Sequence, residues 1–99
     1  MTSIPIVMSA LSDHTRLGAM RLLWDGKEHC GCELMERLGA TQSRTSRHMG
    51  VLKSAGLVVD RRDAQWVRYR RNPALGRELI AIIDAVIAAL PSERRRKAA

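Results

Sequence analysis

The spacing of apolar residues predicts two helices at the start of the chain. Residues 4–11 form a short apolar segment, and apolar residues then recur at i, i+3, i+6 and i+7 from Leu17 to Trp24. Ser12 or Asp13 can cap the second helix, because a short oxygen-bearing side chain accepts hydrogen bonds from the first free N–H groups of a helix. We expect Gly26 to end this helix.

Two more helices are predicted around a tight turn. A third helix should begin near the cysteines of the stretch "EHCGCEL" and end at Gly39. A few residues separate it from the segment "QSRTSRHMGVLKSAG", for which Thr41 is the expected N-cap and Gly56 the expected C-terminal stop. Two helices joined by so short a turn form a helix-turn-helix.

The pattern then changes from a helical period to that of a strand. The runs "LVVDRR" and "QWVRYRR" flank a polar turn at residues 63 and 64 and predict a β-hairpin. Trp66 and Tyr69 would point to opposite faces of a regular strand, so we expect at least one of them in the core. Asn-Pro at residues 72 and 73 can open a last helix. Its apolar residues fall at helical spacing: Leu75, Leu79, Ile82, Ile83, Val86, Ile87 and Leu90.

These elements predict a fold that is mainly α with a β-hairpin wing (α+β). The order of four helices, two strands and a last helix is that of a winged helix-turn-helix flanked by helices at both ends. Ninety-nine residues with 45% hydrophobic content suffice for one domain. We expect the basic tail "SERRRKAA", residues 92–99, to be disordered.

The charge of the chain indicates the class of its partner. Seventeen Lys and Arg residues oppose ten Asp and Glu residues, and the formal net charge of +7 suits a nucleic acid. No apolar run reaches the roughly 18 residues of a membrane span, and the N-terminus lacks the basic start of a targeting peptide. We therefore expect a soluble, cytoplasmic protein whose partner is double-stranded DNA and not a membrane. Residues 1–91 are assigned to a DNA-binding and dimerisation domain.

The fourth helix carries the side chains that we expect to read DNA. A recognition helix reaches base edges with its N-terminal residues, where Arg can bond guanine, Gln can bond adenine and Ser can bond bases or phosphate. The candidates in its first two turns are Gln42, Ser43, Arg44, Ser46, Arg47 and His48. The candidates on the hairpin, which would meet phosphates or the minor groove as a wing, are Arg61, Arg62, Gln65 and Arg68. A solvated helix face and an edge strand protected by charge are the alternative interpretations.

Both cysteines of the chain, Cys30 and Cys32, lie in "EHCGCEL" with one glycine between them. This spacing is poorly suited to a disulfide that staples the fold, and thiols in a reducing compartment are more often ligands or reactive groups. On a helix, two such side chains would lie roughly 200° apart. We therefore expect that binding of one small ion by both thiols requires the first turn of the third helix to open, which Gly31 eases. Two incidental buried cysteines are the alternative.

Four segments, "LSDHTRLGAMRLL", "EHCGCEL", "QSRTSRHMGVLKSAGLVVDRR" and "WVRYRRNP", resemble the ArsR/SmtB family of metal- and metalloid-responsive repressors. The resemblance covers residues 8 to 73 and is to the arsenic-responsive branch. Members with an "ELCVCDL" signature use its two cysteines as ligands, which implies the same role for Cys30 and Cys32. The DNA-contacting positions of the family fall on Gln42, Arg44, Ser46, Arg47 and His48, in agreement with the analysis of the residues themselves.

The sequence departs from this family at the cysteine site. Met35 stands where arsenic-responsive relatives often carry a third cysteine, and its uncharged thioether is a weaker ligand. A third donor is therefore left open among His29, solvent, a small thiol or none. The zinc site that another branch builds on the last helix is absent, because this helix has Asp84 but no histidine.

Thiolates select soft ions over hard ones. We therefore expect a transcriptional repressor, not an enzyme, that leaves operator DNA when As(III) or Sb(III) binds the cysteine pair as inducer. No organic cofactor is expected. The alternatives are the same repressor sensing Cd(II), Pb(II), Zn(II) or thiol oxidation, a thiol-redox enzyme, and an architectural DNA-binding protein without a ligand.

The apolar stripe of the last helix is larger than one small domain needs to cover, which predicts a homodimer across a two-fold axis. The first helix is expected to contribute to the same interface. The dimerisation residues predicted on the last helix are Leu79, Ile82, Ile83, Val86, Ile87 and Leu90.

Overall fold

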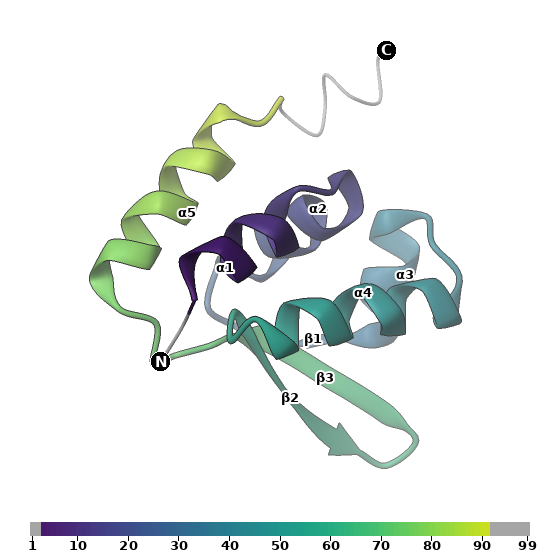
Figure 1. The fold of residues 1–99 in the computed structure, drawn as a ribbon. Helices are drawn as coiled ribbons and strands as arrows, with labels where there is room; N and C mark the ends of the chain where they lie inside the picture. Colours follow the sequence, from purple (N-terminus) through teal and green to yellow (C-terminus); the bar gives the residue numbers. More distant parts are fainter. Residues whose placement is uncertain (1–2, 92–99) are drawn as a thin grey trace.

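A computed structural model describes residues 3–91 and confirms the predicted winged helix-turn-helix (Figure 1). Its elements in chain order are α1 (Ile4–Leu11), α2 (His14–Leu23), β1 (His29–Cys30), α3 (Gly31–Leu38), α4 (Gln42–Ser54), β2 (Val58–Asp63), β3 (Trp66–Arg71) and α5 (Arg77–Ala89). The tail that we predict to be disordered, residues 92–99, lies outside the described residues.

The predicted helix boundaries in the first half of the chain are confirmed at their caps. The Asp13 carboxylate accepts a hydrogen bond from the Arg16 N–H at 2.9 Å, and the Thr41 hydroxyl accepts one from the Arg44 N–H at 3.2 Å. After α3, Gly39 adopts a left-handed backbone with φ of 62°, which lets the chain turn sharply into α4. The turn of the helix-turn-helix is thus determined by local chemistry.

The sheet has one strand more than the sequence predicts. β1 pairs antiparallel with β3, and the strand order is β1-β3-β2. Two residues are too short to produce a recognisable alternation, and β1 is specified by its pairing instead. The hairpin turn also lies one residue later than expected, because Asp63 still pairs with Trp66 and Ala64 takes the positive φ of 57°.

The last helix begins later than predicted. Asn72 and Pro73 do not open it; α5 starts at Arg77 after Gly76. The Asn72 side chain accepts a hydrogen bond from the Ala74 N–H and donates one to the Gly56 carbonyl, both at 2.9 Å, so it ties the end of the hairpin to the end of α4. Leu75 is buried in the loop before the helix.

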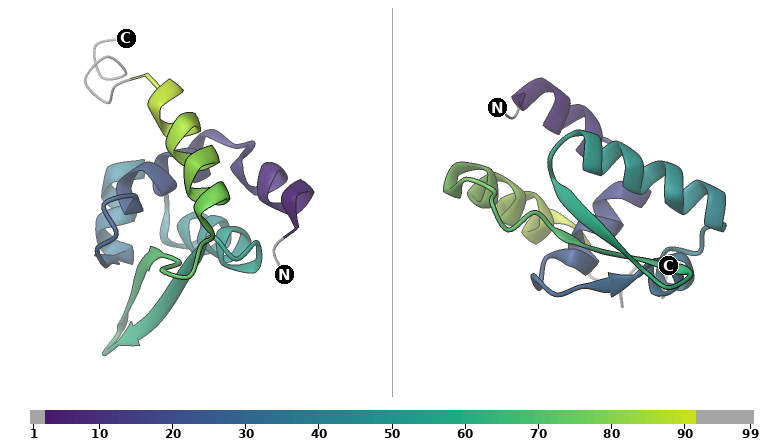
Figure 2. Two further views of the ribbon diagram at one scale, coloured as in Figure 1. Left: turned by 90° about the vertical axis from the view of Figure 1, so that its left-hand side faces the viewer. Right: turned by 90° about the horizontal axis from the view of Figure 1, so that it is seen from below.

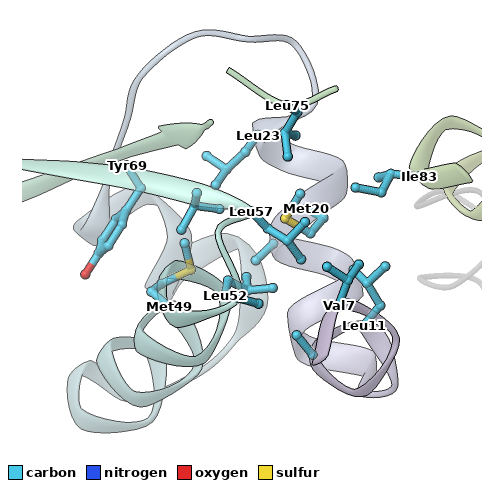
Figure 3. Close-up of a cluster of buried hydrophobic side chains, with 14 of the residues drawn as sticks. Val7, Leu11, Met20, Leu23, Met49, Leu52, Leu57, Tyr69, Leu75 and Ile83 are labelled. Carbon is cyan, nitrogen blue, oxygen red and sulfur yellow. The ribbon is translucent and has the colours of Figure 1, made fainter. Parts of the chain in front are cut away.

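The core lies where α1, α2, α4 and the base of the hairpin meet (Figure 3). The largest fully buried side chains are Val7, Met20, Leu23, Leu34, Met49, Leu52, Leu57 and Ile83. Tyr69 joins this cluster, as expected for one of the two strand aromatics, whereas Trp66 is 42% exposed. The core holds α4 against the body of the protein, and the hairpin projects away from α5 (Figure 2).

Candidate DNA-binding surface and cysteine site

The exposed face of α4 carries most of the residues that the sequence predicts to contact DNA. Thr45, Met49 and Leu52 face the core and fix the rotation of the helix. The exposed candidates in the first two turns are Gln42, Ser43, Arg44, Ser46 and Arg47. Because they share one end of a helix with the hairpin beside it, they have the arrangement of a recognition helix and wing.

His48 is not part of this surface. Its side chain is buried, with 8% exposure, because residue 48 lies three positions after the inward-facing Thr45. Its Nδ1 lies 3.1 Å from the Arg16 guanidinium and 3.8 Å from the Asp13 carboxylate. Arg16 also donates to the Ala10 carbonyl at 2.6 Å. The predicted DNA contact of His48 is therefore corrected to a structural one, in which His48 joins α4 to the start of α2.

Two of the four predicted wing residues form ion pairs within the protein. The Arg61 guanidinium donates to both Glu28 oxygens at 2.6 and 2.8 Å, and this contact lowers the pKa of the Glu28 carboxyl. Arg68 donates to Asp63 at 2.7 Å and lowers the pKa of that carboxyl in the same way. Arg62 and Gln65 are exposed. Exposed ion pairs of this kind contribute little stability, so a phosphate can compete for these arginines.

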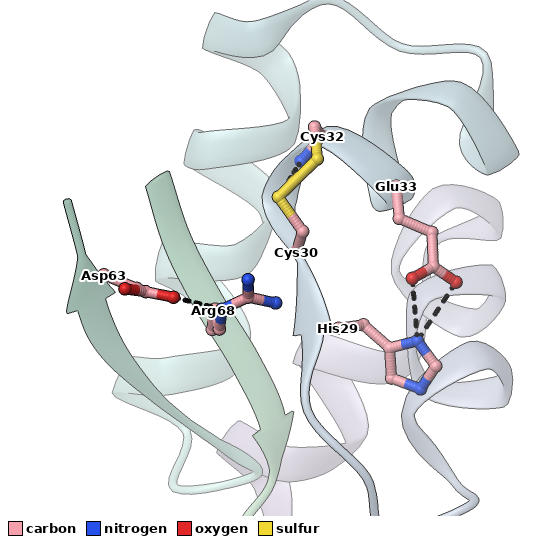
Figure 4. The surroundings of a disulfide bond; sticks show 6 residues. All are labelled: His29, Cys30, Cys32, Glu33, Asp63 and Arg68. Atoms are coloured by element: carbon pink, nitrogen blue, oxygen red, sulfur yellow. Dashed lines mark hydrogen bonds and ion pairs between the residues drawn. A yellow bond between two sulfur atoms is a disulfide. The ribbon is translucent and has the colours of Figure 1, made fainter. Parts of the chain in front are cut away.

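The two cysteines converge at the junction of β1 and α3. Cys30 ends β1 and caps α3, and its Sγ accepts a hydrogen bond from the Cys32 N–H at 3.2 Å. The two Cα atoms lie 5.2 Å apart, and a disulfide joins the sulfur atoms (Figure 4). The bridge links neighbouring residues and does not connect distant parts of the fold.

This geometry overturns the expectation that helix α3 must open before both sulfurs can reach one ion. Two side chains lie roughly 200° apart only when both residues are helical, but Cys30 has an extended backbone with φ of −65° and ψ of 143°. Only Cys32 lies within the helix, so its side chain and that of Cys30 turn towards each other. The sequence-based expectation concerned a disulfide that staples the fold, and the bridge between Cys30 and Cys32, two residues apart, is not of that kind.

The cysteine pair belongs to the same sheet as the wing. Cys30 is the register partner of Arg68 on β3, and His29 is the partner of Tyr69. A Cβ atom added to Gly31 would lie 3.4 Å from the Val67 carbonyl oxygen, which shows how closely the backbone between the cysteines approaches β3. Sequence reasoning missed this contact, since β1 carries no periodic signal.

His29 does not accompany the two sulfurs. Its Nδ1 lies 3.1 Å from Glu33 and its Nε2 lies 3.0 Å from Asp25, so both ring nitrogens are engaged away from the bridge (Figure 4). Among residues 3–91, no group of three His, Cys, Asp or Glu side chains has the arrangement of a metal site. The chain thus brings together two soft sulfur donors and does not bring the predicted third donor to them.

The predicted dimerisation residues divide into two sets. Leu79 and Ile83 are buried within the protomer, because this face of α5 closes the core, and Ile87 packs beside them. The assignment of Leu79 and Ile83 to a subunit interface is corrected accordingly, whereas Ile87 is only partly buried and stays a candidate. The remaining residues, Ile82, Val86 and Leu90, are partly or fully exposed. Three apolar residues of α1 are exposed as well: Ile4, Ile6 and Met8.

Comparison with known proteins finds a family that this chain matches. Residues 13–59 match the family described as bacterial regulatory protein, arsR family. The arsenic resistance transcriptional regulator ArsR2 of Pseudomonas putida is 47% identical over 75 residues, which cover 76% of this chain and 65% of the relative. The chain therefore spans slightly less than two thirds of the length of that regulator.

A second relative is covered more completely. The arsenical resistance operon repressor of Escherichia coli K12 is 39% identical over 82 residues, which cover 82% of this chain and 70% of the repressor. Among solved structures, the homodimeric winged helix-turn-helix domain Mb0332 of Mycobacterium bovis superposes with a TM-score of 0.72 at 27% identity, covering 86% of this chain and 75% of that one. None of the helices described in residues 3–91 has the length and apolar character to cross a membrane.

The surroundings of His29 predict a pH-dependent contribution to stability. Burial disfavours its charged form, but the hydrogen bonds and charges of Asp25 and Glu33 outweigh burial and raise the pKa of His29 above its ordinary value of 6.5. Stabilisation is therefore fully present below pH 6.5 and is lost as the pH rises through the raised pKa. The partners are partly exposed, so the effect is about 1 kcal/mol or less.

We expect His29→Gln to remove this pH dependence. Urea unfolding of both proteins from about pH 6 to about pH 8.5 should show the two free energies of unfolding converging as the pH rises. Parallel profiles for the two proteins would contradict the proposed ion pairs.

Proposed function

The chain belongs to the arsR family of bacterial regulatory proteins, and from this premise we propose that it is a repressor that binds operator DNA and senses metalloid. As(III) or Sb(III) binds the thiolates of Cys30 and Cys32 and releases the protein from DNA. One observation carries this proposal: the two sulfurs converge at the junction of α3 with β1, a strand that is paired with β3 of the wing. Two relatives, an arsenic resistance regulator and an arsenical resistance operon repressor, support the choice of ligand.

In the proposed complex, α4 enters the major groove of the operator. Gln42, Ser43, Arg44, Ser46 and Arg47 are the exposed side chains available for bases and nearby phosphates. The wing then contacts an adjacent part of the duplex. Its candidates are Arg61, Arg62, Gln65 and Arg68. The excess of positive charge, +7 over the whole chain, favours this partner.

The inducer site requires the reduced protein. Two thiolates supply two soft donors with affinity for As(III), whereas bridged sulfurs carry no thiolate. Because Cys30 and Cys32 already converge, binding needs no unwinding of α3. A third ligand, where the ion takes one, comes from solvent or a small thiol, since His29 is engaged with Asp25 and Glu33.

The signal then passes from the sulfurs to DNA through direct contacts. β1 pairs with β3 of the wing, and α3 packs against both β3 and the recognition helix α4. A shift of Cys30 relative to Cys32 therefore changes the angle between wing and helix, which DNA binding requires to be fixed. A hundredfold loss of operator affinity corresponds to only about 2.7 kcal/mol of coupling.

The bridge favours a second candidate, the sensing of oxidants. Two thiols lose two protons and two electrons to a two-electron oxidant such as a peroxide, and the disulfide of Cys30 and Cys32 is then the signal. Both candidates use the same sulfurs and the same path to the wing. They differ in whether release from DNA persists when a reductant is present.

The proposed repressor is a homodimer that joins α1 and α5 of two copies. The exposed apolar residues of these helices, among them Ile6, Ile82 and Val86, supply the interface. The homodimeric state of the Mb0332 domain supports this assembly. Two copies related by a two-fold axis would match an inverted repeat in the operator.

We predict that Arg47→Ala weakens binding to the operator by roughly 1 to 3 kcal/mol, because one base or phosphate contact is lost. A matched control is Arg77→Ala, which removes the same charge from a side chain that is 94% exposed at the start of α5. Fluorescence anisotropy with labelled duplexes of selected and scrambled sequence measures both affinities. An equal loss of affinity for the two duplexes would show that Arg47 contacts only phosphate. No loss of affinity for either duplex would show that Arg47 does not contact DNA.

We predict that Ile82→Asp produces a monomer, because it places a charge in the proposed apolar interface. Ile82 is 37% exposed in the single chain, so the protomer should still fold. Ala81→Asp, on the neighbouring exposed position of the same helix, should remain dimeric. Sedimentation equilibrium distinguishes these states, and a dimeric Ile82→Asp protein would place the interface elsewhere.

We predict that Cys30→Ser and Cys32→Ser each keep operator affinity and lose release by arsenite, because a hydroxyl does not replace a soft thiolate at neutral pH. Titrations of the DNA complex with arsenite, antimonite, cadmium, lead and zinc should use a phosphine reductant, which does not compete as a thiol ligand. A double variant that still leaves DNA on addition of arsenite would overturn the inducer site. Release of the wild type by peroxide alone would favour the second candidate.

A further inference from the structure

A small cleft of about 80 Å³ lies between the recognition helix and the wing. We call it the helix-wing cleft. Gln42 and Ser46 of α4 and Gln65 and Trp66 of the hairpin line it and are exposed, so they form its mouth. Thr45 is 3% exposed and lines its floor, where the hydroxyl oxygen makes no hydrogen bond to the described residues. The cleft is too small for an organic effector, since such sites usually measure about 300 Å³ or more.

Trp66 is the largest of the exposed apolar side chains that the structure describes. Tyr69, three residues along β3, reaches the core, but Trp66 begins the strand beside the hairpin turn and leaves 42% of its surface exposed. Tryptophan has a large apolar ring and one N–H donor, and at surfaces it commonly marks a contact with a partner. Because Trp66 lies next to the recognition helix, a partner that contacts it would also contact α4.

The chemistry of the helix-wing cleft fits one strand of the DNA backbone. Its lining residues, all of which the structure describes, include an aromatic ring, amides and hydroxyls but no charged side chain. A deoxyribose presents an apolar face to an aromatic ring, and phosphate oxygens readily accept hydrogen bonds from neutral Gln and Ser donors. If α4 lies in the major groove, a strand that borders this groove and also reaches the wing runs beside the cleft between them.

We propose that the sugar-phosphate backbone of one operator strand lies across the mouth of the helix-wing cleft, with the Trp66 ring packed on a deoxyribose. Gln42, Ser46 and Gln65 donate hydrogen bonds to the adjacent phosphate oxygens. The proposal rests on the proposed DNA-binding function and assigns Trp66 a role in it. The contact is with the backbone, so it contributes to affinity for any sequence.

The same cleft lies next to the inducer site. Gly31, the residue between the two cysteines, lines it, and a Cβ atom added there would lie 3.5 Å from the ring of Tyr69. The backbone that joins the two sulfurs is therefore also a wall of the cleft. In addition to the path through β1 and β3, a change in the separation of the sulfurs would reach the bound strand through Gly31.

The experiment uses the two tryptophans of the chain. In a Trp24→Phe background, Trp66 is the only source of tryptophan emission. The probe is a short duplex that the wild-type protein has selected from a random library, with a scrambled duplex as its partner. We expect Trp66 emission to change in proportion to bound duplex. Unchanged emission at saturation overturns the proposal.

Affinity measurements provide an independent test. Trp66→Ala should weaken binding on the order of tenfold on both duplexes, and Trp66→Phe should keep most of the affinity because it keeps an aromatic face. Circular dichroism melting checks that both variants are folded, and the emission test stands if Trp66→Ala is not. Wild-type affinity of Trp66→Ala on both duplexes overturns the proposal, as does a loss confined to the selected sequence, which would indicate a base contact.

The results of these experiments show whether the cleft proposal alone is wrong or the DNA-binding function is wrong as well. If Arg47→Ala is weakened while Trp66→Ala is not, DNA binding stands and the helix-wing cleft is not its backbone site. If the wild-type protein selects no duplex, both the DNA-binding function and the cleft proposal are overturned.

Discussion

The pairing of β1 with β3 is the contact on which the rest of the proposed mechanism depends. It comprises two residue pairs, His29 with Tyr69 and Cys30 with Arg68. Through it, a thiol near the start of α3 becomes part of the sheet that forms the wing. Without this pairing, Cys30 would lie on a loop, and only the packing of α3 against β3 would connect the cysteines to the hairpin. With it, a change at the sulfurs acts directly on an element that we propose to contact DNA.

Helix α4, the second part of the proposed DNA-binding surface, is held in place by buried apolar side chains and by one polar cluster. Met49 and Leu52 anchor α4 in the core, and His48 meets Arg16 and Asp13 at the start of α2. The recognition helix is therefore fixed to the helical body, whereas the wing is fixed both to β1 and, at its base, to the core and the end of α4. The proposed inducer site lies where β1 meets α3, because Cys30 belongs to β1 and Cys32 to α3. In the proposed mechanism, this position lets two residues separated by one glycine change the relative position of helix and wing.

Local signals in the sequence predicted most of the fold, because Asp13, Thr41 and Gly39 specify helix ends by chemistry within a few residues. The predictions were wrong where tertiary contacts, and not local sequence, determine which side chains are buried and which backbone is extended. Periodicity showed that Ile83 and His48 lie on ordered helices but not which neighbour covers each face. The convergence of the cysteines depends on the extended backbone of Cys30, which follows from pairing with a strand nearly forty residues away. A short strand without a pattern of its own is visible only in three dimensions.

The most direct test of this account is amide hydrogen exchange of the reduced protein with and without arsenite. The account predicts changed protection at Cys30 on β1 and at its neighbours on β3, with the Met35 amide still protected. That amide bonds back to the first turn of α3, so it reports whether the turn stays closed. Faster exchange at Met35 with unchanged protection along β1 and β3 would contradict the account. It would show instead that the inducer acts by unwinding the helix.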